Sequence, residues 1–322
     1  MNTILTDEIE SANNKKMYDQ ICKQLLANVI ILAWIMKECA VEYKDFEVEE
    51  IASKYIEGIP DVSSINVRSG EKIAGTNTES SGINEGKITY DIRFPAIFPK
   101  GDEFIGLLFN IEAHNNYYPR YPIIKRGVYC SSRMISQQYG LDFPKADYNK
   151  VKKVYSIWLI RNNVPKKAEN SITSYDIAET TQIGNTMQPK ENYDLMTVIL
   201  IHLSGDPEDK QSSDLLNLLN ILLSEKLNAS EKIKALEKDF RIPATEQFKS
   251  EVEKMCNLSE GIENIGIEKG VAMGIEQGLI TTIVNMVKNL KLSLDDAIAA
   301  AEIPEDTRES YSMKIKELLQ PS

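Results

Sequence analysis

Two acidic residues and a histidine occupy positions from which they could act together on one phosphate group. Asp91 lies in a segment that alternates apolar and polar residues, and Glu112 ends the next apolar segment, two residues before His114. Residues two apart on a strand point to the same face, so Glu112 and His114 should lie side by side. Mg²⁺ prefers oxygen ligands and commonly takes one or two carboxylates together with water and substrate oxygens. The pattern therefore suits hydrolysis of a phosphodiester assisted by Mg²⁺ or Mn²⁺.

The two segments that carry these residues are predicted to form a β-hairpin. Residues 87–98 alternate like a half-buried strand, and residues 104–113 form an almost continuous apolar run, typical of a strand covered on both faces. Between them, Pro99 to Asp102 supply turn residues. The hairpin would place Asp91 and Glu112 on neighbouring strands, at the end away from the turn.

Hydrophobic periodicity predicts an α/β chain that becomes wholly helical toward its end. Helices repeat apolar residues every three or four positions, whereas strands alternate or run continuously apolar. From residue 213 onward the pattern is helical, and Ser230 and Thr245 are expected to cap helix N-termini. The expected helices cover residues 15–43, 48–56, 123–139, 215–223, 229–240 and 245–258, followed by two short helices in 281–319; the expected strands cover 65–68, 154–160 and 175–179, and 195–203 suits either structure.

Glycine recurs at every fourth position near the C-terminus, at Gly266, Gly270, Gly274 and Gly278. In a continuous helix these residues would form a stripe on one face. The stripe either permits close helix packing or marks a weak helix, because each glycine costs about 1 kcal/mol relative to alanine. We favour a connector.

Three parts are therefore expected. Residues 1–205 would form the α/β domain, and residues 206–262 a helical region packed on it or beside it. Residues 263–322 would hold the connector and the C-terminal helices, through which copies of the chain could form a homo-oligomer.

The composition indicates a soluble globular protein. Hydrophobic residues make up 42% of the chain and charged residues 26%. No apolar run reaches the length of about 20 residues that a membrane span needs, and residues 1–14 lack the basic and apolar segments of a secretory signal. We therefore expect a cytoplasmic protein with no membrane partner.

Several classes of site are excluded by residue counts and spacing. The four cysteines are scattered without a C-x-x-C pair, which removes zinc spacing and makes a disulfide framework unexpected. Only two histidines are present, so a histidine-rich metal site is excluded. The glycine-rich phosphate loop, the dinucleotide-binding turn and the G-x-S-x-G elbow are also missing.

Basic residues gather in one segment of an otherwise acidic chain. The whole chain carries a net charge of −11, whereas residues 120–167 contain many lysines and arginines but only Asp142 and Asp147 as acids. Such a run is either an ordinary solvated face or a surface that faces phosphate. The candidates for contact with a DNA backbone are Arg133, Lys150, Lys152 and Lys153.

Taken together, several segments resemble the nuclease-like transposases, or recombination-promoting nucleases, of the PD-(D/E)XK superfamily. The resemblance extends over residues 15–280 and implies a restriction-endonuclease-like αβββαβ core with a C-terminal α-helical extension. It also implies a metal ion, Mg²⁺ or Mn²⁺, and cleavage of DNA in recombination or in mobile elements. The segments that carry it are Leu25–Leu26, Ile31–Trp34, Tyr90–Phe94, Asn110–Asn115, Tyr118–Gly127, Tyr129–Gln137, Lys153–Trp158 and Met255–Gly261.

The resemblance assigns catalytic roles to Asp91, Glu112 and His114. Asp91 and Glu112 match the metal-binding acids of the second and third core strands. His114 stands where the superfamily has lysine and where this branch commonly has glutamine. A neutral imidazole can donate or accept a hydrogen bond or bind metal, but it cannot replace a permanent positive charge. Two functions therefore follow: an active endonuclease, or a nuclease-fold module with weakened catalysis that binds DNA or protein.

Three further residues are accessory candidates. Glu42, at the end of the first predicted helix, matches an additional acid that some family members supply; the alternative is an exposed residue at a helix end. Arg126 and Gln137 lie on the helix expected beside the site and could contact phosphate or support the acids. For Arg126, a structural salt bridge is the equal alternative.

Overall fold

The computed structural model describes residues 4–63, 79–82, 85–114, 116–143, 147–305 and 307–319. The chain divides into two compact units, one of Lys15–Ser259 and the other of Met1–Asn14 with Glu260–Ser322. All candidate site residues belong to the larger unit. The strand expected over residues 65–68 lies outside the described residues.

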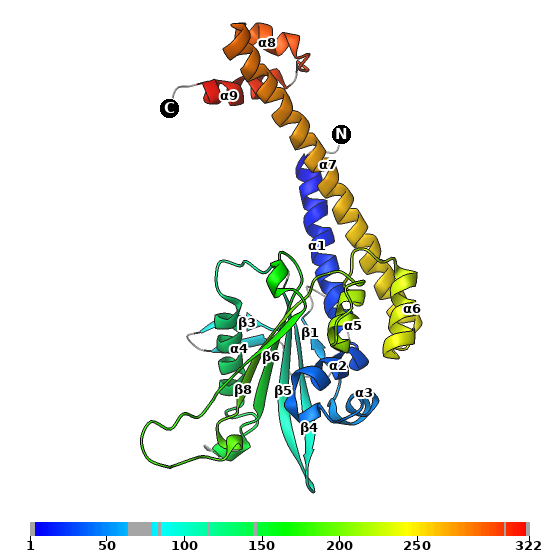
Figure 1. Ribbon diagram of the computed structural model, residues 1–322, viewed down its shortest axis with the longest axis vertical. Coiled ribbons are helices and arrows are strands. Elements are labelled where there is room, and N and C mark those ends of the chain that lie inside the picture. Colours follow the sequence, from blue (N-terminus) through cyan, green and yellow to red (C-terminus); the bar gives the residue numbers. More distant parts are fainter. Residues whose placement is uncertain are drawn as a thin grey trace. The chain divides into compact units, whose positions relative to one another are not determined.

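A six-stranded mixed sheet forms the centre of the larger unit (Figure 1), which confirms the α/β class. The strand order is β1-β4-β5-β6-β8-β7. The three central strands β5, β6 and β8 run parallel, and every other neighbouring pair is antiparallel. The strands are β1 (Asp61–Val62), β4 (Ile92–Lys100), β5 (Glu103–His114), β6 (Lys153–Ile160), β7 (Ser171–Asp176) and β8 (Met196–His202). The segment that suited either structure is thus a strand, and the edge strand predicted over 175–179 begins earlier, at Ser171.

The predicted hairpin is confirmed, but its first strand is not continuous. The backbone of β4 pairs with that of β5 from Ile92 opposite Ile111 to the turn at Gly101, whose φ is 64°. The preceding residues belong to a separate ribbon of β2 (Glu79–Gly82) and β3 (Glu85–Thr89). Asp91 lies at the break because its backbone bonds outside the β4–β5 ladder: its carbonyl accepts from the Ser63 amide at 2.9 Å. The prediction of one strand over 87–98 is therefore wrong.

The predicted long helix over residues 15–43 is also two helices. Helix α1 (Ile4–Leu26) and helix α2 (Val29–Cys39) meet at an angle of 72°. Asn28 causes the break, because its side chain accepts a hydrogen bond from the Ile30 amide and so starts a new helix as an N-cap. A short helix follows near the predicted place, as α3 (Val48–Glu50) continuing into a turn of π-helix over Ile51–Tyr55.

Apolar layers cover both faces of the sheet. Helix α4 (Ile123–Gln137) packs on β6 and β8, and Gly127 lets it approach closely, since a Cβ there would lie 2.5 Å from Cγ1 of Val198. On the opposite face, three rings from neighbouring strands stack in register. The centroids of Phe94 and Phe109 are 5.2 Å apart, and those of Phe109 and Tyr155 are 5.0 Å apart. The parallel strands are therefore buried on both sides, as their apolar sequences predict.

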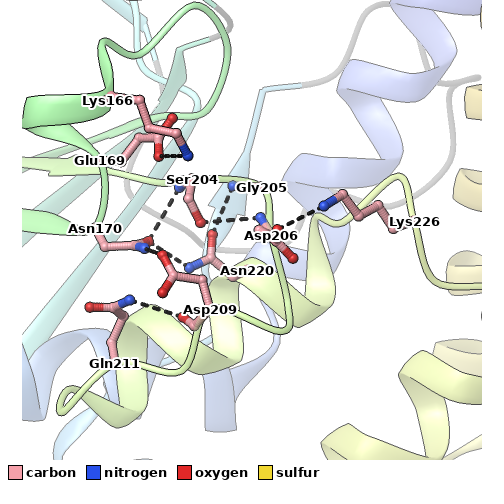
Figure 2. A network of polar contacts seen from close by, with 10 residues as sticks. All are labelled: Lys166, Glu169, Asn170, Ser204, Gly205, Asp206, Asp209, Gln211, Asn220 and Lys226. Carbon is pink, nitrogen blue, oxygen red and sulfur yellow. Dashed lines mark hydrogen bonds and ion pairs between the residues drawn. The ribbon is translucent and has the colours of Figure 1, made fainter.

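A network of polar contacts fastens the segment after β8 to helix α5 (Asp214–Leu222), as Figure 2 shows. Asn170, at a φ of 53°, accepts from the Ser204 amide at 3.3 Å and from Asn220 Nδ2 at 2.8 Å. It also donates to Asp209 at 2.7 Å, and Asn220 accepts from the Gly205 amide at 3.1 Å. Asparagine tolerates this left-handed backbone better than most residues. The network therefore ties the edge strand β7 to the end of β8.

The C-terminal part is helical, as predicted, but one of the two expected caps differs. Helix α6 (Ala229–Phe240) is capped by Asn228 and not by Ser230, because Asn228 forms a reciprocal capping box with Glu231. Thr245 does cap the next helix, accepting from the Phe248 amide at 3.2 Å. The elements that follow are α7 (Glu246–Leu290), α8 (Leu294–Ala300) and α9 (Arg308–Leu319).

The glycine stripe lies inside the continuous helix α7, and its role as a connector stays a prediction. A Cβ added at Gly266, Gly270, Gly274 or Gly278 would meet nothing within 4 Å. The stripe therefore does not serve close helix packing within the described part of the chain. The helix ends in a small apolar cluster with α8 and α9, formed by Ile280, Ile283, Ala297, Ile298, Ile303 and Ile315.

One described helix, α7, is long and apolar enough to cross a membrane by length and composition, and the bent pair α1–α2 passes the same test as a broken span. The centre of α2, including Ile31, Leu32 and Met36, is buried in the fold. Helices of soluble proteins also pass such a test, and the structure is compatible with a soluble protein.

Candidate active site

Asp91 is held between two parts of the chain. Its Oδ1 lies 2.8 Å from Nζ of Lys23, which also contacts Asp19 at 2.6 Å, one turn earlier on α1. Its Oδ2 accepts a hydrogen bond of 3.1 Å from the Ala113 amide on β5. Burial raises the pKa of Asp91, and the Lys23 charge opposes that shift. Lys23 is therefore the cation that favours an ionised Asp91.

Glu112 is buried beside Asp91. Its side chain accepts a hydrogen bond of 3.4 Å from the Asp91 backbone amide, as expected from the hairpin register. Burial, and then the neighbouring charge of Asp91, raise the pKa of Glu112 to about 8. A buried acid, Glu112, and a half-buried one, Asp91, thus share one end of the hairpin, and burial raises the pKa of both.

His114 ends β5 in a half-buried position beside the acids. Its ring centroid lies 6.2 Å from that of Trp158 on β6. Burial, and then the charge of Arg126, lower the pKa of His114, so the imidazole is neutral at pH 7. Within the described part of the chain, its Nε2 is a buried nitrogen without a hydrogen-bond partner. A buried nitrogen of this kind carries a desolvation cost until a ligand atom or water meets it.

Arg126 approaches the same site from α4. Its guanidinium lies 5.3 Å from the ring centroid of Trp158 and 5.9 Å from that of Tyr121, and it donates to the Tyr121 hydroxyl at 2.6 Å. Its positive charge also acts on the carboxyl of Glu112 and opposes the rise in its pKa. Arg126 is thus held by aromatic rings next to the acids.

Glu42 does not join the acids. Its carboxylate contacts Nζ of Lys153 at 3.2 Å and the Tyr155 hydroxyl at 2.5 Å. Tyr155 pairs with Phe109 across the sheet, three residues before Glu112 on β5, so this cluster lies about 10 Å further along the strand. Lys153 also contacts Asp194 at 2.9 Å. Glu42 and Lys153 thus form a structural ion-pair cluster at the other end of β6.

The remaining predicted residues are engaged elsewhere. Gln137 accepts a hydrogen bond of 3.2 Å from Arg93, and Arg133 is buried on α4. Lys152 pairs with Asp142 at 2.5 Å, and Lys150 contacts Asp147 at 3.4 Å. The two acids of the basic segment therefore neutralise two of its four DNA-backbone candidates.

The structure adds Lys23 and Asp19, which the sequence reasoning missed. Residues four apart on a helix, such as Asp19 and Lys23, commonly form exposed ion pairs, so their spacing carries little information. Both side chains are largely buried here.

The donor set fits a hard divalent cation only in part. The described residues contain no group of three His, Cys, Asp or Glu side chains able to hold a metal ion. Mg²⁺, however, often takes only one or two protein carboxylates and completes its shell with water and substrate oxygens. Asp91 and Glu112 would be such a pair. Burial, and then the charge of Asp91, raise the pKa of Glu112, and a bound cation would favour its ionised form.

No protein-family model matches this chain, and comparisons with curated proteins and with solved structures found no match either.

Proposed function

We propose that this protein is a metal-dependent DNA endonuclease whose site is formed by Asp91, Glu112 and His114, with Lys23 as an additional member. The observation that carries the proposal is the pair formed by the half-buried Asp91 and the buried Glu112 at the open end of the hairpin. Lys23 lies 2.8 Å from Asp91, and Glu112 accepts a hydrogen bond from the Asp91 amide.

The order of elements supports the proposal. Along the chain, helices α1 and α2 are followed by the antiparallel strands β1, β4 and β5, then by helix α4 and the parallel strand β6. This order corresponds to the αβββαβ arrangement that the resemblance implies. Asp91 directly precedes β4, and Glu112 lies near the end of β5. The resemblance expects the two metal-binding acids on the second and third core strands.

Each residue has a distinct role in this proposal. Asp91 and Glu112 would hold Mg²⁺ or Mn²⁺, which when bound offsets charge on the phosphate and acidifies a bound water. Lys23 favours the ionised form of Asp91 and adds positive charge near the phosphate. His114 is neutral, and its unpaired Nε2 suits a hydrogen bond to the attacking water or to a phosphate oxygen.

Cleavage of supercoiled plasmid DNA tests the proposal. The wild-type protein should nick the plasmid with Mg²⁺ or Mn²⁺ and stop when EDTA is added. Asp91→Asn and Glu112→Gln should each abolish nicking, because each removes a carboxylate ligand but keeps the side-chain shape. Asp102→Asn, at the exposed hairpin turn, is the matched control and should cut normally. Cutting that survives both site variants and EDTA would reject the proposal.

A second function is favoured by one observation. Lys23 already neutralises Asp91, so the fold does not need a metal ion to balance that charge. A nuclease-fold module that binds DNA or protein without cutting is therefore the alternative. Calorimetric titration of Mn²⁺ at neutral pH separates the two: binding that Asp91→Asn and Glu112→Gln abolish supports the enzyme, and no binding in the wild type supports the module.

We further propose that copies of the chain associate through α7. This helix exposes Ile267, Val271 and Ile275, each directly after one glycine of the stripe. An apolar ladder beside small residues suits close contact with another helix. Sedimentation should show a homo-oligomer, which Val271→Glu should dissociate, whereas a wild-type monomer would reject association.

A cytoplasmic location likewise stays a prediction.

A further inference from the structure

A cavity lined by tyrosines opens beside the candidate site. It measures about 430 Å³, and its lining includes Tyr117, Tyr118, Arg120, Tyr121, Tyr175 and His202. Three of these rings are accessible, since Tyr118 is 66% exposed, Tyr175 43% and Tyr121 39%. Exposed aromatic rings of this number are unusual around one cavity, because large rings normally bury most of their surface. The cavity therefore presents several aromatic faces to a ligand.

The charged side chain that lines this cavity is basic. Among its described lining residues none is acidic, although the chain carries 48 acids and a net charge of −11. Arg120 lines the cavity, and Arg126 is hydrogen-bonded to the Tyr121 hydroxyl. The cavity thus combines aromatic faces with positive charge, which suits a planar ring that carries a phosphate.

The segment that carries the rings is held in place before any ligand arrives. The side chain of Asn116 accepts from the Tyr118 amide at 3.1 Å and donates to the Tyr118 carbonyl at 3.3 Å. The Tyr117 amide donates to the Asn162 carbonyl at 3.0 Å, and its ring centroid lies 5.3 Å from that of His202. A ligand would therefore find the rings already ordered, which lowers the entropic cost of binding.

Two features relate the cavity to the acids, although neither acid lines it. Tyr117 follows His114 by three residues, at the exit of β5. Arg126 lies near the rings of both Tyr121 and Trp158, and its charge acts on Glu112. A strand whose phosphate lies at the acids could therefore place a neighbouring base among the tyrosines.

We infer that this cavity binds an unpaired base of a single-stranded DNA segment next to the bond that is cut. The inference rests on the proposed function and narrows its substrate to DNA with an unpaired strand. Stacking on aromatic rings accepts every base, so binding should depend little on sequence. A paired base cannot enter, because its ring faces are covered by its neighbours in the duplex.

Fluorescence anisotropy with the full-length Glu112→Gln protein tests the inference without cleavage. The probes are a fluorescein-labelled oligothymidylate of about 20 nucleotides and a duplex of equal length. Tyr118→Ala and Tyr175→Ala should each weaken binding of the single strand roughly 5- to 150-fold and leave duplex binding unchanged. Tyr118→Phe should bind like its parent, because it keeps the ring.

Tyr129→Ala provides the matched control, since Tyr129 is an exposed tyrosine on α4 outside the cavity, and it should leave binding unchanged. Parental affinity in both cavity variants, or an equal loss for duplex and single strand, would overturn the inference. So would a protein that fails to bind the oligothymidylate, which would leave the cavity to a peptide. If the wild-type protein cuts DNA with metal but the tyrosine variants bind the single strand normally, only this inference fails. If the tyrosines are needed for binding but the wild-type protein does not cut, only the proposed function fails.

Discussion

The ammonium nitrogen of Lys23 lies 2.8 Å from Oδ1 of Asp91, so the first helix supplies a cation to an acid at the break between β3 and β4. Burial alone would lower the pKa of Lys23, but the charge of Asp91 and hydrogen bonds to Asp19 and Asp91 raise it above its usual value. The lysine is therefore charged at neutral pH. Because Lys23 is paired directly with Asp91, replacing it tests how far this ion pair supports the site.

Replacing Lys23 with methionine should damage both stability and cleavage. The change leaves Asp91 without its cation, and removing one partner of a buried pair costs roughly 3 kcal/mol. Cleavage should fall about 10- to 100-fold, as expected when a residue that orients a ligand is lost. Urea denaturation and plasmid nicking measure the two effects. Lys16→Met, at an exposed position of the same helix, should change neither; full activity in Lys23→Met would show that the lysine is dispensable.

The raised pKa of Glu112 should make stability depend on pH. Its carboxyl keeps its proton up to about pH 8 in the folded chain but ionises near pH 4.5 when unfolded. Between these two pH values the folded state binds more protons than the unfolded state. The stabilisation that comes from the protonated Glu112 is therefore complete below pH 4.5 and is lost as the pH rises to 8. Each unit of pKa corresponds to about 1.4 kcal/mol.

Glu112→Gln mimics the protonated acid and isolates that effect. In EDTA, its free energy of unfolding should match the wild type near pH 5 and exceed it by several kcal/mol near pH 8, because glutamine never ionises. Urea denaturation at both pH values measures the difference. A constant difference between the two proteins across this range would show that Glu112 has no raised pKa.

His114 should titrate below its ordinary pKa of 6.5, because burial and the nearby Arg126 disfavour the imidazolium. The chain has only two histidines, so their ring signals can be followed by NMR and assigned with His114→Gln. This variant keeps a neutral hydrogen-bonding side chain and should retain measurable cleavage, whereas His114→Ala should lose it. A titration midpoint above 6.5 would contradict the neutral role given to this residue.

Gly127→Ala should destabilise the larger unit by roughly 1–3 kcal/mol. The added Cβ would lie 2.5 Å from Cγ1 of Val198 and 3.1 Å from Nε1 of Trp158, so α4 must move away from the sheet. The better helix propensity of alanine, about 1 kcal/mol, offsets only part of this cost. Ser132→Ala, at an exposed position of the same helix, should be close to neutral. Equal stability of Gly127→Ala and the wild type in urea would show that α4 is not tightly packed there.

The sequence determined the local structure that carries the two acids. Alternation before the turn and a continuous apolar run after it define the hairpin of β4 and β5, and two-residue periodicity places Glu112 and His114 on the same face of β5. The helical character of the C-terminal part also follows from periodicity, and Thr245 was recognisable as a cap. These features depend on residues close together in the chain, so the order of apolar and polar side chains is enough to predict them.

Only the tertiary structure decided which charges meet. Lys23 on α1 meets Asp91 at the break before β4, and Glu42 meets Lys153 at the start of β6. The tyrosine cavity likewise joins the loop after β5 to Tyr175 on the edge strand. Contacts between residues far apart in the chain depend on how helices and strands pack. The pattern of residue types along one segment does not say which distant segment will pack against it.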